Sequence, residues 1–122
     1  MDLVVDTNIA IYLLGGDTTV AALLDKRSVG MSFITELELL SYSGITQEEV
    51  NTIEEFVSSC VVVDLTLAVK RHAIAIRREY RLRLPDALVA ATALAYSVPL
   101  MTADRQLERI APLDLLRYDP AL

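Results

Sequence analysis

The sequence is poor in the residues that build disulfide frameworks and Cys/His metal centres. Among 122 residues it has one cysteine, Cys60, and one histidine, His72. A single cysteine cannot form an internal disulfide and is typical of a protein in a reducing compartment, and a Cys/His zinc centre needs more such ligands than the chain contains. Cys60 precedes an apolar run, so we expect a buried residue without chemistry. We expect His72 to be an ordinary surface or packed histidine.

The sequence also lacks a long apolar segment and a secretory signal. No stretch reaches the ~20 apolar residues that cross a bilayer. Asp2 and Asp6 interrupt the amino-terminal apolar run, which has no basic start. We therefore expect a cytoplasmic protein with no membrane partner. Because the chain is 122 residues long and 53% hydrophobic, we expect one compact domain over residues 1–122 with a sizeable core.

Positive charge is scarce overall but concentrated in one segment. The formal net charge is −6, which disfavours a polyanionic partner. However, six of the 11 Lys and Arg residues lie between Lys70 and Arg83, where the only acid is Glu79. This basic strip is either a solvated helix face or a surface that contacts phosphate groups.

Short apolar runs alternate with helical segments along the chain. Buried strands are predicted at residues 3–5, 29–33, 61–63 and 100–102, with a further short strand at 113–116. Helices are predicted at residues 9–14, 18–26, 47–58, 65–81, 85–97 and 105–110, and another from residue 32 or 35 to about 42. This alternation predicts a three-layer α/β fold, with a central parallel sheet of four or five strands and helices on both faces.

The segment from residue 84 to residue 104 carries the clearest local signals. Pro85 suits the first position of a helix, and the alanine-rich run that follows has strong helix propensity. Asp86 then lies in the first helical turn. Pro99 and the residue before it end the helix, and the next strand brings Asp104 just past its carboxyl end. Open α/β sheets bind their ligands at that edge.

Four acids fall at corresponding places in this layout. They are Asp6 after the first strand, Glu38 in the helix after the second, Asp86 at a helix start and Asp104 after the fourth strand. Carboxylates gathered at one edge of a sheet repel one another unless a cation lies between them, and hard oxygen ligands suit Mg²⁺ or Mn²⁺. A Mg²⁺ ion held by carboxylates most often serves phosphate chemistry, because it orients water and stabilises charge on phosphorus-bound oxygen.

Each acid also has a purely structural interpretation. Asp6 and Asp104 can act as helix caps, and Asp86 can complement the helix dipole. Residues 35–38 match the Thr-x-x-Glu capping box, which accounts for the second glutamate without any site, and Glu36 competes with it for a site role. Capping alone does not require all four acids to lie at one edge.

At these residues the chain resembles the PIN-domain ribonucleases, and within that family the VapC toxins of toxin–antitoxin pairs. The resemblance covers nearly the whole length. It rests on Val4-Val5-Asp6-Thr7-Asn8, on Ser32-Phe33-Ile34-Thr35 followed by Glu38-Leu39, on the Asp-led helix Asp86 to Ala93, and on Leu100-Met101-Thr102-Ala103-Asp104. In the family pattern, the acid of the second motif falls on Glu38 rather than on Glu36.

The resemblance implies a metal-dependent endoribonuclease that hydrolyses RNA phosphodiester bonds. The implied Mg²⁺ or Mn²⁺ site consists of Asp6, Glu38, Asp86 and Asp104. Of these, Asp6 and Asp86 are implied direct ligands, with Glu38 and Asp104 completing the site or orienting the attacking water. Thr7, Asn8 and Thr102 are implied to support the site by hydrogen bonds. Gln106 stands where many relatives carry another acid, which argues against a fully occupied two-metal site.

The resemblance also implies partners. Toxins of this kind are typically homodimers neutralised by a small VapB antitoxin, whose tail occupies a groove and often sends an arginine toward the acids. We expect that contact near residues 9–14, the helix from residue 18 or the helix over residues 70–83. For an RNA substrate, Arg77 and Arg81 of the basic strip are the residues we expect to bind it.

Two other functions remain open at this point. The first is a phosphoacceptor receiver-like signalling domain, with Asp64 after the third strand as its acceptor. That function requires a pocket lysine after a late strand, whereas the only lysines are Lys26 and Lys70. The second is a PIN fold that binds RNA or protein without cleavage, which the intact set of four acids disfavours.

Overall fold

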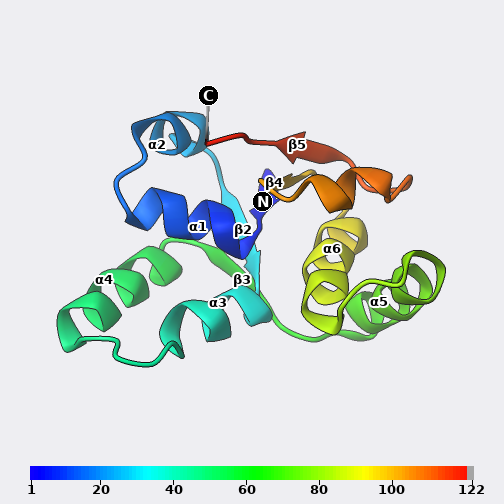
Figure 1. The fold of residues 1–122 in the computed structure, drawn as a ribbon, viewed down its shortest axis with the longest axis horizontal. Helices are drawn as coiled ribbons and strands as arrows, with labels where there is room; N and C mark the ends of the chain where they lie inside the picture. The colour runs from blue at the N-terminus through cyan, green and yellow to red at the C-terminus, as the bar shows by residue number, and fades with distance from the viewer. Residues whose placement is uncertain (121–122) are drawn as a thin grey trace.

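The computed structural model describes residues 1–120, which form a five-stranded sheet with all strands parallel, in the order β3-β2-β1-β4-β5 (Figure 1). The strands are β1 (Leu3–Val5), β2 (Val29–Ser32), β3 (Val61–Val63), β4 (Leu100–Thr102) and β5 (Leu115–Arg117). The helices are α1 (Thr7–Leu14), α2 (Thr18–Leu24), α3 (Phe33–Leu40), α4 (Gln47–Ser58), α5 (Leu67–Tyr80) and α6 (Leu84–Tyr96), followed by a short 3-10 helix, η1 (Arg105–Arg109). The predicted α/β class is confirmed, and the sheet has five strands rather than four.

Helices cover both faces of the sheet because alternate residues of each strand point to opposite sides. Val4 and Leu100 join one apolar cluster with α5 and α6. Leu3, Val5 and Met101 join a second cluster with α1, α2, α3 and α4. Figure 1 shows these two groups of helices on either side of the sheet. The central strands are therefore buried on both faces, which explains why they read as continuous apolar runs.

The sheet order excludes the receiver-like alternative. Receiver domains have the order 2-1-3-4-5, with the third strand next to the first. In this chain β1 lies between β2 and β4, and β3 is an edge strand. Asp64 follows that edge strand and is exposed, so it does not occupy the central position of a phosphoacceptor.

Several predicted element boundaries were wrong for local reasons. α2 ends at Leu24 rather than near residue 26, and Lys26 adopts a left-handed φ of 61° that a helix cannot continue through. For α3, the predicted start at Ser32 is confirmed and the alternative at Thr35 is wrong: the helix begins at Phe33 with Ser32 as its N-cap, so residues 35–38 lie inside it and are not a capping box. Residues 105–109 form a 3-10 helix, and the last strand begins at residue 115 rather than 113.

The middle of α6 is enclosed by the rest of the fold. Residues 87–93 are all buried, and the four alanines among them have small side chains that let the helix approach β1, β2 and α5 closely. The helix ends at Ser97, which has a left-handed φ of 53°. Within residues 1–120 no single helix is long and apolar enough to cross a bilayer, and α1 with α2 passes that test only as a pair bent by 116°.

Enlarging one of these alanines should destabilise the protein. Ala90 is fully buried, so we expect Ala90→Leu to lower the free energy of unfolding by about 1–3 kcal/mol, the usual cost of overpacking. Chemical denaturation measures this difference. The matched control is Ala75→Leu on the exposed surface of α5, which should change stability by less than about 0.5 kcal/mol. Equal effects of the two substitutions would contradict the close packing of α6.

Candidate active site

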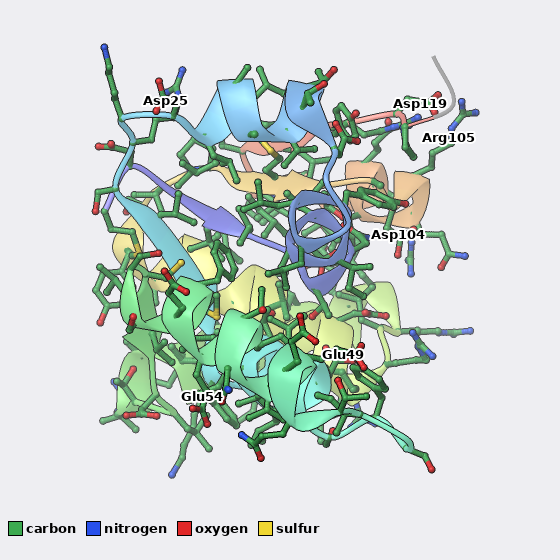
Figure 2. The ribbon with its side chains drawn as sticks, turned by 90° about the vertical axis from the view of Figure 1, so that its left-hand side faces the viewer. Asp25, Glu49, Glu54, Asp104, Arg105 and Asp119 are labelled. Atoms are coloured by element: carbon green, nitrogen blue, oxygen red, sulfur yellow. The ribbon has the colours of Figure 1, made fainter. Side chains whose placement is uncertain are left out.

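The candidate site lies where the strand order reverses between β1 and β4. Chain connections leave these two strands in opposite directions across the sheet, and open α/β sheets bind their ligands at the carboxyl ends of the strands at such a point. Asp6 follows β1, and Asp104 follows β4. Figure 2 shows Asp104 next to α1, on the opposite side of the molecule from Asp25, which precedes β2. The predicted placement of these two acids at one edge is therefore seen in the structure.

Asp6 is partly buried, and hydrogen bonds hold both of its carboxylate oxygens. It is the N-cap of α1, and its Oδ1 accepts the backbone N–H of Thr7 at 2.8 Å. Its Oδ2 accepts the hydroxyl of Thr102 at 2.7 Å and the side-chain amide of Asn8 at 3.4 Å. The capping interpretation of Asp6 is thus correct, but capping uses only one of the two oxygens.

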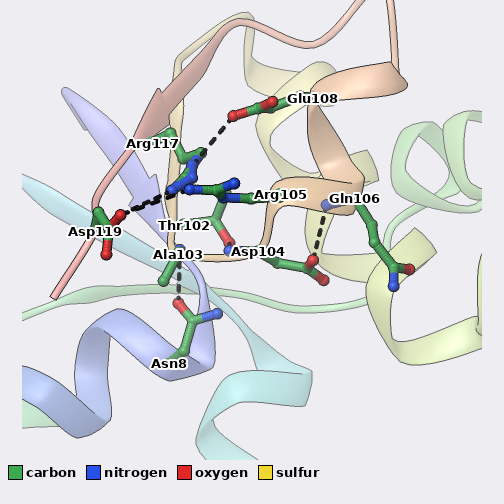
Figure 3. Close-up of polar contacts among 9 residues, drawn as sticks. All are labelled: Asn8, Thr102, Ala103, Asp104, Arg105, Gln106, Glu108, Arg117 and Asp119. Atoms are coloured by element: carbon green, nitrogen blue, oxygen red, sulfur yellow. Dashed lines mark hydrogen bonds and ion pairs between the residues drawn. The ribbon is translucent and has the colours of Figure 1, made fainter. Parts of the chain in front are cut away.

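The three residues expected to support the acids all contact them or the segments that carry them. Thr102 is fully buried, and its hydroxyl also accepts the backbone N–H of Asp104 at 3.0 Å. The side-chain oxygen of Asn8 accepts the N–H of Ala103 at 3.2 Å (Figure 3). These bonds tie the start of α1 to the end of β4, so the positions of Asp6 and Asp104 are coupled.

Asp104 is itself a cap for the short helix that follows it. Its Oδ1 accepts the N–H of Gln106 at 2.9 Å (Figure 3). Behind this turn, Arg117 of β5 pairs with Glu108 at 3.1 Å and with Asp119 at 3.4 Å. The ion pairs fasten η1 to β5 and thereby support the segment that carries Asp104.

Glu38 reaches the site through a threonine rather than through a helix cap. The hydroxyl of Thr7 donates to Glu38 Oε1 at 2.7 Å, and it also lies 3.0 Å from the hydroxyl of Thr35. Thr35 is fully buried inside α3, so it was wrong to read it as a helix cap. The contact with Thr7 attaches Glu38 to the residue that follows Asp6.

Asp86 lies in the first turn of α6, as predicted, and pairs with a neighbouring arginine. Arg83 Nε is 3.3 Å from Asp86 Oδ2, and the Arg83 side chain is 84% exposed. An ion pair this open to solvent contributes little to stability. Arg83 is therefore free to leave Asp86 when another cation approaches.

The charges of two of the other candidate acids act on Asp6. Burial raises the pKa of Asp6 above its ordinary value, and the charges of Asp86 and Asp104 raise it further. The hydrogen bonds from Thr102 and from the N–H of Thr7 act in the opposite direction. The unshielded negative charge at this edge is what a bound cation would relieve.

The donor chemistry fits a hard divalent cation, although the acids are not gathered around a single point. Within residues 1–120, no three Asp, Glu, His or Cys side chains lie close enough together to share one ion. Asp86 is turned toward Arg83, and Asp104 toward the helix that it caps. The available donors are carboxylate and hydroxyl oxygens, which are the ligands that Mg²⁺ and Mn²⁺ prefer.

Sequence reasoning missed two residues of this site. Thr35 was recognised only as part of a motif, and the signal for its role was its regular spacing from Ser32 and Glu38. Arg83 was counted in the basic strip, and the signal was its position three residues before Asp86, which is a contact spacing on a helix. His72 is exposed, in agreement with the predicted surface histidine, whereas Cys60 is half-buried rather than buried, and burial raises the pKa of its thiol.

Comparisons with known proteins bear on the family and the fold. A family model described as "PIN domain" matches residues 3–113. The fold is similar to VapBC2 from Rickettsia felis bound to promoter DNA, with 22% identity, a TM-score of 0.87 and coverage of 98% of this chain and 100% of that one.

Two further solved structures share the fold. DNA-bound VapBC from Salmonella typhimurium has 22% identity, a TM-score of 0.83 and coverage of 96% of this chain and 98% of that one. VapBC-5 from Mycobacterium tuberculosis has 22% identity, a TM-score of 0.71 and coverage of 97% and 100%. No curated protein matches the chain.

The raised pKa of Asp6 makes a prediction about stability without metal. In the folded state Asp6 holds its proton more tightly than in the unfolded state, so its contribution to stability falls as the pH rises above about 3.9, the ordinary Asp value. In EDTA at pH 7, Asp6→Asn should therefore melt at a higher temperature than the parent, with the gain disappearing below about pH 4. Thermal melting across pH measures this.

Asp17 supplies the matched control for that measurement. Hydrogen bonds from the N–H of Val20 and the hydroxyl of Tyr118 lower the pKa of Asp17, so its charged form favours the folded state. Asp17→Asn should therefore lower the melting temperature at pH 7. If Asp6→Asn lowers the melting temperature as Asp17→Asn does, the charged form of Asp6 does not destabilise the folded protein.

Proposed function

The chain belongs to the PIN domain family, and on that premise we propose that it is a metal-dependent endoribonuclease that hydrolyses RNA phosphodiester bonds. We propose further that it is the toxin of a VapBC-type toxin–antitoxin pair and acts in the cytoplasm as a homodimer. The observation that carries the proposal is the placement of Asp6 and Asp104 after the paired strands β1 and β4, with the hydroxyl of Thr102 and the side chain of Asn8 joining the end of β4 to the residues that follow β1. Both acids lie at the switch point of the sheet, which is where open α/β sheets bind their ligands.

In the proposed mechanism, Asp6 and Asp86 would hold Mg²⁺ or Mn²⁺, with Glu38 and Asp104 completing the site or orienting water. The bound ion would supply stabilisation of the negative charge that develops on the phosphate oxygens. The protein's own hydrogen bonds fix the donors in advance. Thr102 and the N–H of Thr7 hold the Asp6 carboxylate, and the Thr7 hydroxyl holds Glu38. Such preorganisation reduces the rearrangement needed when substrate binds.

Loss of one acid should abolish cleavage without loss of the fold. We expect Asp86→Asn to reduce cleavage of a mixed RNA pool in Mg²⁺ by at least about 100-fold, the scale of losing one electrostatic contact to a reacting group. The parent protein, freed of any antitoxin, should lose its cleavage when EDTA is added. Gel analysis of the RNA products measures both effects.

The control for this experiment is Glu36→Gln, which removes a charge from α3 outside the proposed site. That variant should cleave RNA like the parent protein. If Asp86→Asn remains active, the ribonuclease assignment is wrong. If the folded parent protein binds RNA and never cuts it, the alternative of a binding-only PIN fold is correct.

A groove next to Glu38 has the chemistry expected of an antitoxin site. The groove has a volume of about 510 Å³ and is lined by Ile11, Leu14, Gly15, Glu38, Leu39, Tyr42, Glu48, Glu49, Thr52 and Ile53. Its floor is apolar and three glutamates are among its lining residues, so it would suit an amphipathic helix that also carries a basic side chain. Similar structures are described as toxin–antitoxin or VapBC complexes. We propose that a VapB-type antitoxin binds here.

A charge placed in the groove should block the antitoxin but not the enzyme. Ile11 is 54% exposed, so Ile11→Asp should leave the fold and the RNA cleavage intact. With a VapB-type antitoxin that inhibits the parent protein, this variant should bind at least about tenfold more weakly by calorimetry. The control is Leu67→Asp at a 62% exposed position of α5. If the two variants bind alike, the antitoxin contacts another surface.

A further inference from the structure

A second pocket lies between the carboxyl-terminal half of α5 and the start of α6. It has a volume of about 520 Å³ and is lined by Ala73, Ile74, Arg77, Arg78, Arg81, Leu82 and Leu84. The three arginines are exposed, and no acid is among the lining residues. Arg81 caps α5 in a left-handed conformation with φ 54°, which turns the chain back toward α6. The turn thereby brings Arg81 and Leu84 to the same pocket as Arg77.

The arginines of this pocket are not neutralised by the protein. In the part of the chain that the structure describes, the ion pairs involve Arg83, Arg105 and Arg117 but none of the pocket arginines. Each therefore has its guanidinium donors available for an external anion. Planar guanidinium groups match phosphate with two parallel hydrogen bonds and also stack on flat rings.

The pocket also has an apolar floor that a purely electrostatic surface does not need. Ile74 is 58% exposed and Leu84 is 52% exposed, while Ala73 and Leu82 lie buried beneath. Apolar surface beside arginine suits an unstacked base, which single-stranded RNA can offer and an intact duplex cannot. The combination thus favours a single-stranded nucleotide over a duplex backbone.

The pocket adjoins the first turn of α6, which also carries Asp86. Leu84 is the first residue of α6, Arg83 is its N-cap, and Arg83 pairs with Asp86 in the next turn. We propose that the pocket of Arg77, Arg78, Arg81, Ile74 and Leu84 is a subsite for single-stranded RNA, which binds a nucleotide next to the one being cut. This inference rests on the proposed ribonuclease function. The proposed subsite includes Arg77 and Arg81, which were predicted from sequence to bind RNA. To these it adds Arg78 and the apolar floor of the pocket.

A second copy of the chain is a less suitable occupant. A two-fold interface brings the same patch of both subunits together, so three arginines would face three arginines without an acid in the lining to compensate them. An RNA strand brings the negative charge that the pocket lacks. The pocket also lies on the α5 and α6 side of the sheet, away from the acidic groove beside α1 and α4.

The test is equilibrium binding of a fluorescein-labelled, random-sequence RNA 12-mer to antitoxin-free protein in EDTA, where metal-dependent cleavage does not occur. Arg77→Ala and Arg78→Ala should each weaken binding by roughly 3- to 10-fold and lower the slope of log K against log salt by about 0.7. Arg71→Ala, an exposed residue of the same helix outside the pocket, is the matched control. Arg81 should be changed to Asn rather than Ala, because its φ is positive.

Two further variants test the role of the apolar floor. Ile74→Ala should weaken binding of the single-stranded 12-mer and leave binding of a hairpin duplex unchanged, whereas Leu67→Ala, on the same helix but outside the pocket, should change neither. Melting temperatures equal to the parent value establish that each variant is folded. A duplex bound as well as the single strand, with both affected equally by Ile74→Ala, would overturn the base-binding role.

Three results would overturn the subsite as a whole. The first is that the parent protein does not bind RNA, and the second is that Arg71→Ala weakens binding as much as Arg78→Ala does. The third is that the pocket variants lose self-association while their affinity for RNA is unchanged. The last result would assign the pocket to a second copy of the chain. Failure of the subsite is distinguishable from failure of the enzyme. Pocket variants that bind and cleave RNA normally contradict only the subsite, whereas a parent protein that binds RNA in this pocket without cutting it contradicts only the ribonuclease.

Discussion

The partly buried carboxylate of Asp6 is the constraint on which the rest of the site depends. A parallel sheet places the ends of β1 and β4 side by side, and the hydroxyl of Thr102 from β4 donates to the acid that follows β1. The site is therefore part of the sheet's own framework rather than an addition to a loop. Burial and two neighbouring acids disfavour the charged form of Asp6. The ionised carboxylate therefore destabilises the fold, and a bound cation would relieve this. Such costs are typical of functional sites.

α6 links the core to both functional surfaces. Its alanine-rich middle packs against the sheet and α5, while its first turn carries Asp86, one of the four candidate acids, and Leu84, which lines the arginine pocket. Arg83 stands between these surfaces and pairs with Asp86. The protein as a whole is acidic, with a net charge of −6, so an RNA strand meets repulsion over much of the surface. Concentrating the free arginines beside α6 would guide the strand toward the acids.

The class of fold was predictable because its signals are local. Apolar runs of three or four residues, separated by helical segments, indicated the parallel sheet, and the proline before Asp86 marked the start of α6. The strand order was not predictable, since it depends on which strands pair across the whole chain.

Glu38 shows the same limit of prediction within the site. Its sequence suggested a capping box with Thr35, whereas the family resemblance placed it in the site. The three-dimensional contacts of Thr7 with both residues attach Glu38 to the residue that follows Asp6. The pairing of Arg83 with Asp86 could have been predicted from their spacing of three residues on a helix. The pocket between α5 and α6 could not have been predicted, because it depends on the left-handed turn at Arg81.

The most direct test of the central claim is a titration of the free protein with Mn²⁺, followed by paramagnetic broadening of its backbone amide signals in NMR spectra. The account predicts that signals of Asp6, Asp86 and Asp104 broaden first, together with those of their immediate neighbours, while signals from the outer surface of α4, such as Glu54, remain sharp. Broadening centred on α4, or no selective broadening at all, would contradict a cation site built on these acids.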